Sequence, residues 1–137
     1  MTELVRDAML RDPLALDSEA TAQEAGRRLA DPDVRAVLVC DTGRLVGVIT
    51  RKTLVREVVA AGRDPGSTAL GAIAEPPLHT IRADAGLDEA FRDLEERDLE
   101  RVPVVEEDGR LAGVISRAVV QRRLAEDEPP PEDETTS

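Results

Sequence analysis

The sequence predicts a mixed α/β fold in which one unit of strand, helix, strand, strand and helix occurs twice. Two octapeptides carry this prediction, GRLVGVIT at residues 43–50 and GRLAGVIS at residues 109–116, which differ at only two positions. Both are followed by arginine, and the similarity extends over about 60 residues per copy, which is typical of units that share a buried face. Since each unit alone has too little core to be secure, we expect the two copies to pack together about a pseudo-twofold axis.

The strands are predicted from short runs of Val, Leu and Ile that are separated by turn residues. In the first copy the runs cover residues 37–40 and 45–49, and Gly43 between them is able to take a positive φ. In the second copy they cover residues 102–105 and 111–115. A further short strand is expected upstream in each copy, at residues 14–16 and 79–81.

Two helices per copy are predicted from apolar residues that recur at helical spacing. The stripe of the helix before the paired strands consists of Leu87, Ala90, Phe91 and Leu94 in the second copy and, more weakly, of Ala22, Ala25 and Leu29 in the first. The helix after the paired strands is expected to turn Leu54, Val55 and Val58 to one face in the first copy, and Val120 and Leu124 in the second. Gly62 is a suitable residue to end the first of these helices.

These elements divide the chain into four segments. The first repeat is assigned to residues 1–62, a linker to residues 63–69, the second repeat to residues 70–125 and an acidic tail to residues 126–137. The tail holds six carboxylates and no base, so it contributes −6 of the formal net charge of −11. Because such a tail cannot bury apolar surface, we expect it to be disordered.

Composition excludes several classes of function. The folded body has nearly balanced charge and the chain has no Trp or Tyr, which disfavours nucleic-acid binding. No apolar run approaches the ~20 residues of a membrane span, and the N-terminus lacks a signal-peptide core, so we expect a cytoplasmic protein without membrane association. The single cysteine, Cys40, excludes an internal disulfide and Cys-rich zinc clusters.

The joint pattern resembles a tandem pair of cystathionine-β-synthase (CBS) domains, a stand-alone Bateman module. The segments that carry the resemblance are RAVLVCDTGRLVGVIT from Arg35 and RVPVVEEDGRLAGVIS from Arg101, with the openings VRDAMLRDPLAL from Val5 and LGAIAEPPLHTI from Leu70. The resemblance covers residues 4 to 125. It implies an α/β fold with the copies packed through their sheets, frequent dimerisation into a flat disc, and frequent binding of AMP, ADP, ATP or S-adenosylmethionine between the copies.

The end of the repeated strand has the chemistry of a phosphate cradle. Thr50 and Ser116 each end a strand and begin a helix, which predicts N-caps followed by unpaired backbone N–H groups that favour an anion. Arg51 and Lys52 in the first copy and Arg117 in the second add positive charge. The alternative is a helix cap without a ligand, which is the commoner role of Ser and Thr.

The chain departs from the family pattern at the residue that contacts ribose. The pattern places Asp three residues after the Thr or Ser, where this chain has Thr53 and Val119. Losing a charged acceptor costs about 1.5–3 kcal/mol in either copy. Thr53 still offers one hydroxyl and Val119 offers none, so we expect any nucleotide to prefer the cleft at Thr50. Family positions that border the ligand and contact the base match Ala15, Leu16, Ala36 and Val37 in the first copy and Thr80, Ile81, Val102 and Pro103 in the second. For these eight residues the alternative is plain core packing.

The remaining reactive residues do not assemble a catalytic site. A catalytic constellation needs a nucleophile, a base and an orienting group, and none is visible, so we do not expect an enzyme. His79 is expected at a solvent-facing strand end, with a phosphate contact as the alternative, and Cys40 is expected to pack. Two functions therefore compete: a regulatory module that senses an AMP- or ATP-type nucleotide and acts on a separate, unknown effector protein, and a ligand-free homodimer that serves protein interaction. No cofactor is required by either.

Overall fold

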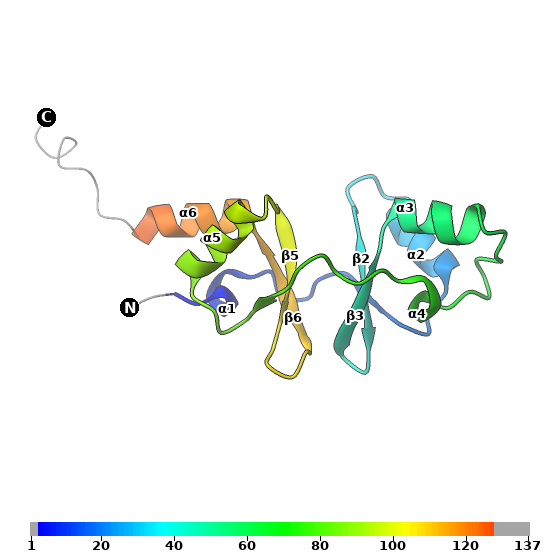
Figure 1. The fold of residues 1–137 in the computed structure, drawn as a ribbon, viewed down its shortest axis with the longest axis horizontal. Helices are drawn as coiled ribbons and strands as arrows, with labels where there is room; N and C mark the ends of the chain where they lie inside the picture. The colour runs from blue at the N-terminus through cyan, green and yellow to red at the C-terminus, as the bar shows by residue number, and fades with distance from the viewer. Residues whose placement is uncertain (1–2, 128–137) are drawn as a thin grey trace, which may run out of the picture.

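A computed structural model describes residues 3–127 and contains two three-stranded sheets with helices on their outer sides (Figure 1). The first copy comprises β1 (Ala15–Asp17), α2 (Ala22–Leu29), β2 (Val37–Asp41), β3 (Arg44–Ile49), α3 (Arg51–Leu54) and the π-helix η1 (Val55–Val59). The second comprises β4 (Ile81–Arg82), α5 (Leu87–Glu96), β5 (Arg101–Val105), β6 (Leu111–Ser116) and α6 (Arg117–Asp127). Two short helices, α1 (Val5–Ala8) and α4 (Leu70–Ile73), lie at the start of the first and the second copy.

The predicted order of strand, helix, strand, strand and helix is confirmed in both copies. In each sheet the first strand runs parallel to the middle strand, and the last strand runs antiparallel to it, giving the orders β1-β2-β3 and β4-β5-β6. The paired strands are joined by turns in which Gly43 and Gly109 have φ of 86° and 89°. L-residues with side chains rarely adopt this conformation, so the first glycine of each octapeptide is required by its turn.

The two cores are built by exchange between the copies. Helix α1 opens the first copy, yet Val5 and Met9 are buried in the core of the second copy against α5, α6 and the sheet β4-β5-β6. Helix α4 opens the second copy, yet Leu70 and Ile73 are buried in the core of the first. Neither these two helices nor the exchange was predicted from the sequence, because four-residue helices carry too few positions for a periodic signal.

Reciprocal hydrogen bonds confirm the pseudo-twofold relation. The N–H of Leu45 donates to the carbonyl of Gly109 (3.2 Å), and the equivalent N–H of Leu111 donates to the carbonyl of Gly43 (3.0 Å). The same reciprocity joins the exchanged segments to the sheets. The N–H and C=O of Leu10 pair with those of Val114 (2.8 and 3.0 Å), and those of Glu75 pair with Val48 (3.0 and 2.8 Å).

The second glycine of each octapeptide lies where an exchanged segment crosses the last strand of a sheet. A Cβ on Gly47 would lie 2.6 Å from Ala74 Cβ, and a Cβ on Gly113 would lie 2.4 Å from the carbonyl oxygen of Leu10. Both distances are shorter than van der Waals contact, so a side chain at either position would displace the backbone that crosses it. The repeated glycine is therefore a requirement of the contact between the copies.

One helix face differs from the prediction. Leu54 packs on the first core and Val58 is buried, but Val55, which was expected beside them, is 59 % exposed. From Val55 onward the helix forms i→i+5 hydrogen bonds, such as Ala60 N–H to Val55 C=O at 2.8 Å. This wider turn changes the helical phase, so Val55 and Val59 point outward. The helix ends at Val59, three residues before the predicted Gly62, and Gly62 has a φ of 72° in the turn that follows.

The ends of the chain limit what the structure says about the predicted segments. Helix α6 continues to Asp127, and the rest of the acidic tail assigned to residues 126–137 lies outside the described residues. Residues 60–69 lie between η1 and α4 and include the segment 63–69 that is assigned to the linker. Within residues 3–127, no helix has both the length and the apolar composition that crossing a membrane requires.

Candidate functional site

Strand register brings the candidate residues of each copy to one end of its sheet. In the first copy Val37 pairs with Ile49, so Ala36 and Val37 lie beside the strand end at Thr50. Ala15 pairs with Leu38 on the other side of β2, which places Ala15 and Leu16 at the same end.

The second copy repeats this arrangement. Val102 pairs with Ile115 and Pro103 with Val114, next to Ser116. Ile81 pairs with Val104, and Thr80 directly precedes it. Each copy thus gathers its own candidates around one strand-to-helix turn.

The two predicted N-caps are confirmed. Thr50 Oγ1 accepts a hydrogen bond from the N–H of Thr53 at 3.3 Å, and Ser116 Oγ accepts one from the N–H of Val119 at 3.2 Å. Both hydroxyls are half-buried. Each cap therefore satisfies one of the free N–H groups of its helix start. At the Ser116 turn a second one, the N–H of Arg117, is also taken, because it donates to the carbonyl of Glu100 at 2.8 Å.

Thr53 is turned into the protein instead of toward a ligand. Its side chain is fully buried, and its Oγ1 accepts a hydrogen bond from the N–H of Thr50 at 3.1 Å and lies 3.0 Å from Thr50 Oγ1. The pair forms a reciprocal capping box. A ribose contact by Thr53 would require this hydroxyl to leave its partners, so in this conformation Thr53 stabilises the turn and offers no sugar contact.

Burial divides the apolar candidates into two groups. The side chains of Val37, Ile81 and Val102 are at most 6 % exposed and belong to the two cores. Only their backbone groups remain available to a ligand. The half-buried candidates, whose side chains retain some access, are Ala15, Leu16, Ala36, Thr80 and Pro103.

The basic residues at the two turns differ in their partners. Arg117 forms ion pairs with Glu100 and, at 3.7 Å, with Asp98. Arg51 instead donates to the backbone carbonyl of Asp31 at 2.8 Å, and within residues 3–127 neither Arg51 nor Lys52 forms an ion pair with a carboxylate. The positive charge at the Thr50 turn is therefore less compensated than that at the Ser116 turn.

Sequence reasoning missed one pair of basic residues. Arg101 is directly opposite Ser116 in the β5–β6 register, and Arg35 occupies the equivalent position beside Ala36. Both side chains are exposed. The signal was present in the duplication, because the two arginines are 66 positions apart, as are the two octapeptides.

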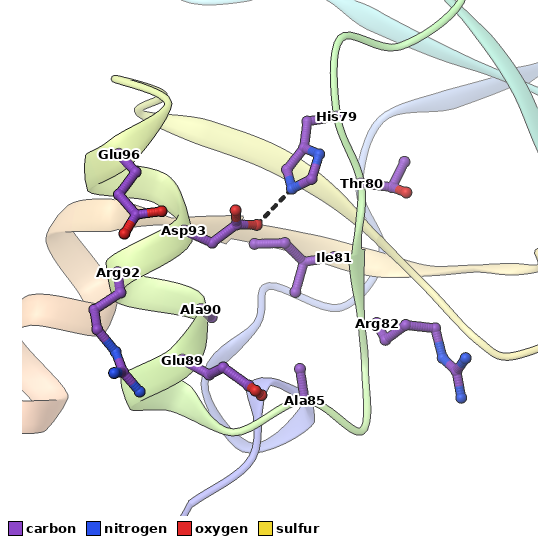
Figure 2. Close-up of a pocket in the computed structure, with 10 residues that line it drawn as sticks. All are labelled: His79, Thr80, Ile81, Arg82, Ala85, Glu89, Ala90, Arg92, Asp93 and Glu96. Atoms are coloured by element: carbon purple, nitrogen blue, oxygen red, sulfur yellow. Dashed lines mark hydrogen bonds and ion pairs between the residues drawn. The ribbon is translucent and has the colours of Figure 1, made fainter.

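His79 lies in a groove of about 500 Å³ between β4 and α5, and two candidate ligand residues, Thr80 and Ile81, also line this groove (Figure 2). Its Nε2 lies 2.5 Å from Asp93 Oδ2, and Arg97 Nε donates to Asp93 Oδ1 at 2.9 Å. Figure 2 shows Thr80 on the opposite side of the strand. Arg97 and then His79 hold the pKa of the Asp93 carboxyl below its ordinary value. The ion pairs of Asp93 with Arg97 and His79 therefore stabilise the folded protein at pH values above the pKa that Asp93 has in the unfolded chain. This stabilisation is lost as the pH falls through the lower pKa that Asp93 has in the folded protein.

The other reactive groups of the described region form no metal or nucleophile site. Burial, followed by the charge of Asp17, raises the pKa of the Cys40 thiol, which favours the unreactive thiol form. Within residues 3–127 no group of three or more His, Cys, Asp and Glu side chains is placed to hold a metal ion.

Comparison with known proteins identifies the family. Hypoxic response protein 1 of Mycobacterium tuberculosis is 31% identical to this chain over 122 residues, which cover 88% of this chain and 85% of that protein. This chain also resembles a crystal structure of Hypoxic Response Protein I with two coordinated zinc ions, with a TM-score of 0.72 and 29% identity. The match covers 88% of this chain and 98% of the chain in that structure.

A second solved structure is that of CBSX2 in complex with AMP, with a TM-score of 0.68, 25% identity and coverage of 90% of this chain and 96% of that chain. The CBS domain itself matches residues 5–60 and again residues 70–126, which together span most of the sequence. The chain therefore belongs to the CBS domain family and carries the domain twice.

Proposed function

We propose that this CBS pair is a regulatory module that binds an adenosine-containing ligand of the AMP, ADP, ATP or S-adenosylmethionine type and acts on a separate effector protein. The observation that carries the proposal is the pair of capped strand-to-helix turns at Thr50 and Ser116, each beside arginine. Cap hydroxyls, free N–H groups and arginines together are suited to phosphate. The AMP complex of CBSX2, which this chain matches over 90% of its length, supports the ligand class.

The ligand prefers the turn at Thr50. Among the residues that the structure describes, Arg51 and Lys52 have no carboxylate partner, whereas Arg117 at the other turn pairs with Glu100 and Asp98. A phosphate at the Ser116 turn would have to compete with these acids. The preference thus rests on charge and not on the Thr53 hydroxyl, which is buried.

We expect AMP or ATP to bind with micromolar or weaker affinity and to raise the melting temperature, because a ligand at 100 times its Kd stabilises the folded state by about 2.7 kcal/mol. Thr50→Ala is expected to weaken binding about tenfold in calorimetry, the loss of one hydrogen bond to a charged group. Ser116→Ala is the matched control, since it removes the same kind of cap at the equivalent position. Equal losses from both variants would contradict the preference, and no binding by the parent protein would contradict the ligand.

A second function, a ligand-free homodimer for protein interaction, is favoured by one observation. Val55 and Val59 on η1 are 59 % and 74 % exposed and lie one turn apart. The equivalent positions of the second copy hold Gln121 and Ala125, so this apolar face is unique to the first copy. A second copy of the chain packed on it would remove both valines from water.

Light scattering is therefore expected to show a dimer at micromolar concentration, and Val59→Glu is expected to convert it to a monomer, because a carboxylate would be buried without a partner. Ala125→Glu makes the equivalent change on α6, where the side chain is also exposed, and is expected to leave the dimer intact. A parent protein that is monomeric, or a dimer that survives Val59→Glu, would contradict this interface.

A further inference from the structure

Two arginines face each other where the hairpin turns of the copies meet on the pseudo-twofold axis. Arg44 and Arg110 are equivalent residues of the two octapeptides and are direct partners in an antiparallel β-bridge. The hydrogen bonds of this bridge come from their neighbours, Leu45 and Leu111. Residues paired in this way have Cα atoms about 4.5 Å apart, with side chains that leave the backbone on the same face.

Within residues 3–127 the two guanidinium groups have no carboxylate partner. Both side chains are exposed, and in the described part of the chain neither forms an ion pair or a side-chain hydrogen bond. The guanidinium of Arg110 lies across the opposite turn, since a Cβ on Gly43 would be only 2.9 Å from its Nη2 and 3.2 Å from its Cζ. The missing side chain of Gly43 thus leaves the space in which Arg110 reaches toward the hairpin of Arg44.

Like charges directly opposite each other on two strands are unfavourable. A planar guanidinium presents paired N–H donors that match the oxygens of phosphate and carboxylate, and two such groups on one face can bind both sides of one anion. We propose that Arg44 and Arg110 form a binding site for a small dianionic oxyanion of the phosphate type, located on the axis and separate from the turns at Thr50 and Ser116.

Carboxylates of the two turns could pair with Arg44 or Arg110 in place of an external anion. Glu106 accepts hydrogen bonds on both oxygens from Arg6 (3.0 and 3.1 Å), and Glu107 lies 4.0 Å from Arg82. Asp108 Oδ1 accepts from the backbone N–H of Arg110 at 3.1 Å. Asp41 is opposite Arg44 in the β2–β3 register without forming an ion pair. Asp41 is therefore the carboxylate that competes most directly with an external anion, and Asp41→Asn tightens binding.

Amide NMR shifts during a titration with inorganic phosphate, against sodium chloride of equal ionic strength, test the site. The N–H signals of Leu45 and Leu111 are expected to shift and saturate with phosphate but not with chloride. In the double variant Arg44→Gln, Arg110→Gln, the phosphate concentration needed for half of the shift is expected to rise at least tenfold. The control, Arg27→Gln with Arg28→Gln, makes the same charge change at two exposed arginines of α2 that do not face each other, and it retains the response.

Phosphate that binds the Thr50 turn shifts the amides of residues 51–53 instead, so the two sites are read separately. Absence of a saturable shift at Leu45 and Leu111, or an unchanged shift in the Arg44/Arg110 double variant, overturns the proposal. A second measurement needs no ligand: at low ionic strength without phosphate, Arg44→Gln has a melting temperature at least as high as the parent, because the repulsion is removed. A lower melting temperature would show that the arginines make favourable contacts of their own and would overturn the proposal.

Discussion

Replacing Gly113 by alanine is expected to destabilise the folded protein by about 2–4 kcal/mol, through overpacking and strained hydrogen bonds. The new Cβ would lie 2.4 Å from the carbonyl oxygen of Leu10 and 3.0 Å from Met9 Sδ. Leu10 cannot withdraw freely, because both its N–H and its C=O are bonded to Val114, at 2.8 and 3.0 Å. The substitution therefore strains the exchanged segment along its contact with β6.

Urea denaturation followed by circular dichroism measures this loss as a lower midpoint at unchanged slope. Gly26→Ala is the matched control. The nearest atom to a Cβ on Gly26, within helix α2, is Leu54 Cδ1 at an ordinary 3.8 Å. That variant is expected to be more stable than the parent by about 0.5–1 kcal/mol, because alanine is the better helix former. A Gly113→Ala variant as stable as Gly26→Ala would contradict the crossing of the two segments.

Replacing Leu70 by alanine is expected to cost about 2–5 kcal/mol and to unfold both copies together. Leu70 is fully buried and belongs to α4, which opens the second copy in sequence but packs in the core of the first. The cavity therefore weakens the first core directly. It weakens the second indirectly, because the copies share their exchanged segments and their hairpin contacts and cannot separate without losing both.

Circular dichroism, which reports the whole backbone, and methyl NMR signals from each core are expected to give one coincident transition. Leu78→Ala makes the same chemical change at a side chain that is 90 % exposed, and it is expected to alter stability by no more than about 0.5 kcal/mol. Loss of the first-core signals while the second core remains folded would contradict the shared stability.

Local patterns were sufficient to predict most of the individual elements. The runs that became β2, β3, β5 and β6 are contiguous apolar segments, and their boundaries agree with the structure to within about one residue. The N-caps at Thr50 and Ser116 also depend only on a residue and its next three neighbours. The ligand roles assigned to the fourteen candidate residues remain predictions, since they depend on contacts that a strand or a cap does not define.

Some side chains have a role that depends on distant residues. Thr53 matches the family's ribose position in sequence, but its hydroxyl is buried against Thr50. The difference in charge between the two turns arises because the chain brings Glu100 and Asp98 against Arg117. A sequence lists these acids among many others, and only their positions in space show which base they neutralise.

The sequence alone was enough to predict that the chain is a duplication, that each copy is a strand-helix-strand-strand-helix unit, and that a hydroxyl caps the helix after each repeated strand. These properties follow from periodicity and from contacts between residues close together in the chain. The tertiary structure decided that α1 and α4 pack in each other's copies, that Gly47 and Gly113 must lack side chains, and that Arg44 meets Arg110 on the axis. Each of these depends on which distant segments lie side by side, and packing of the two copies against each other is what brings those segments together.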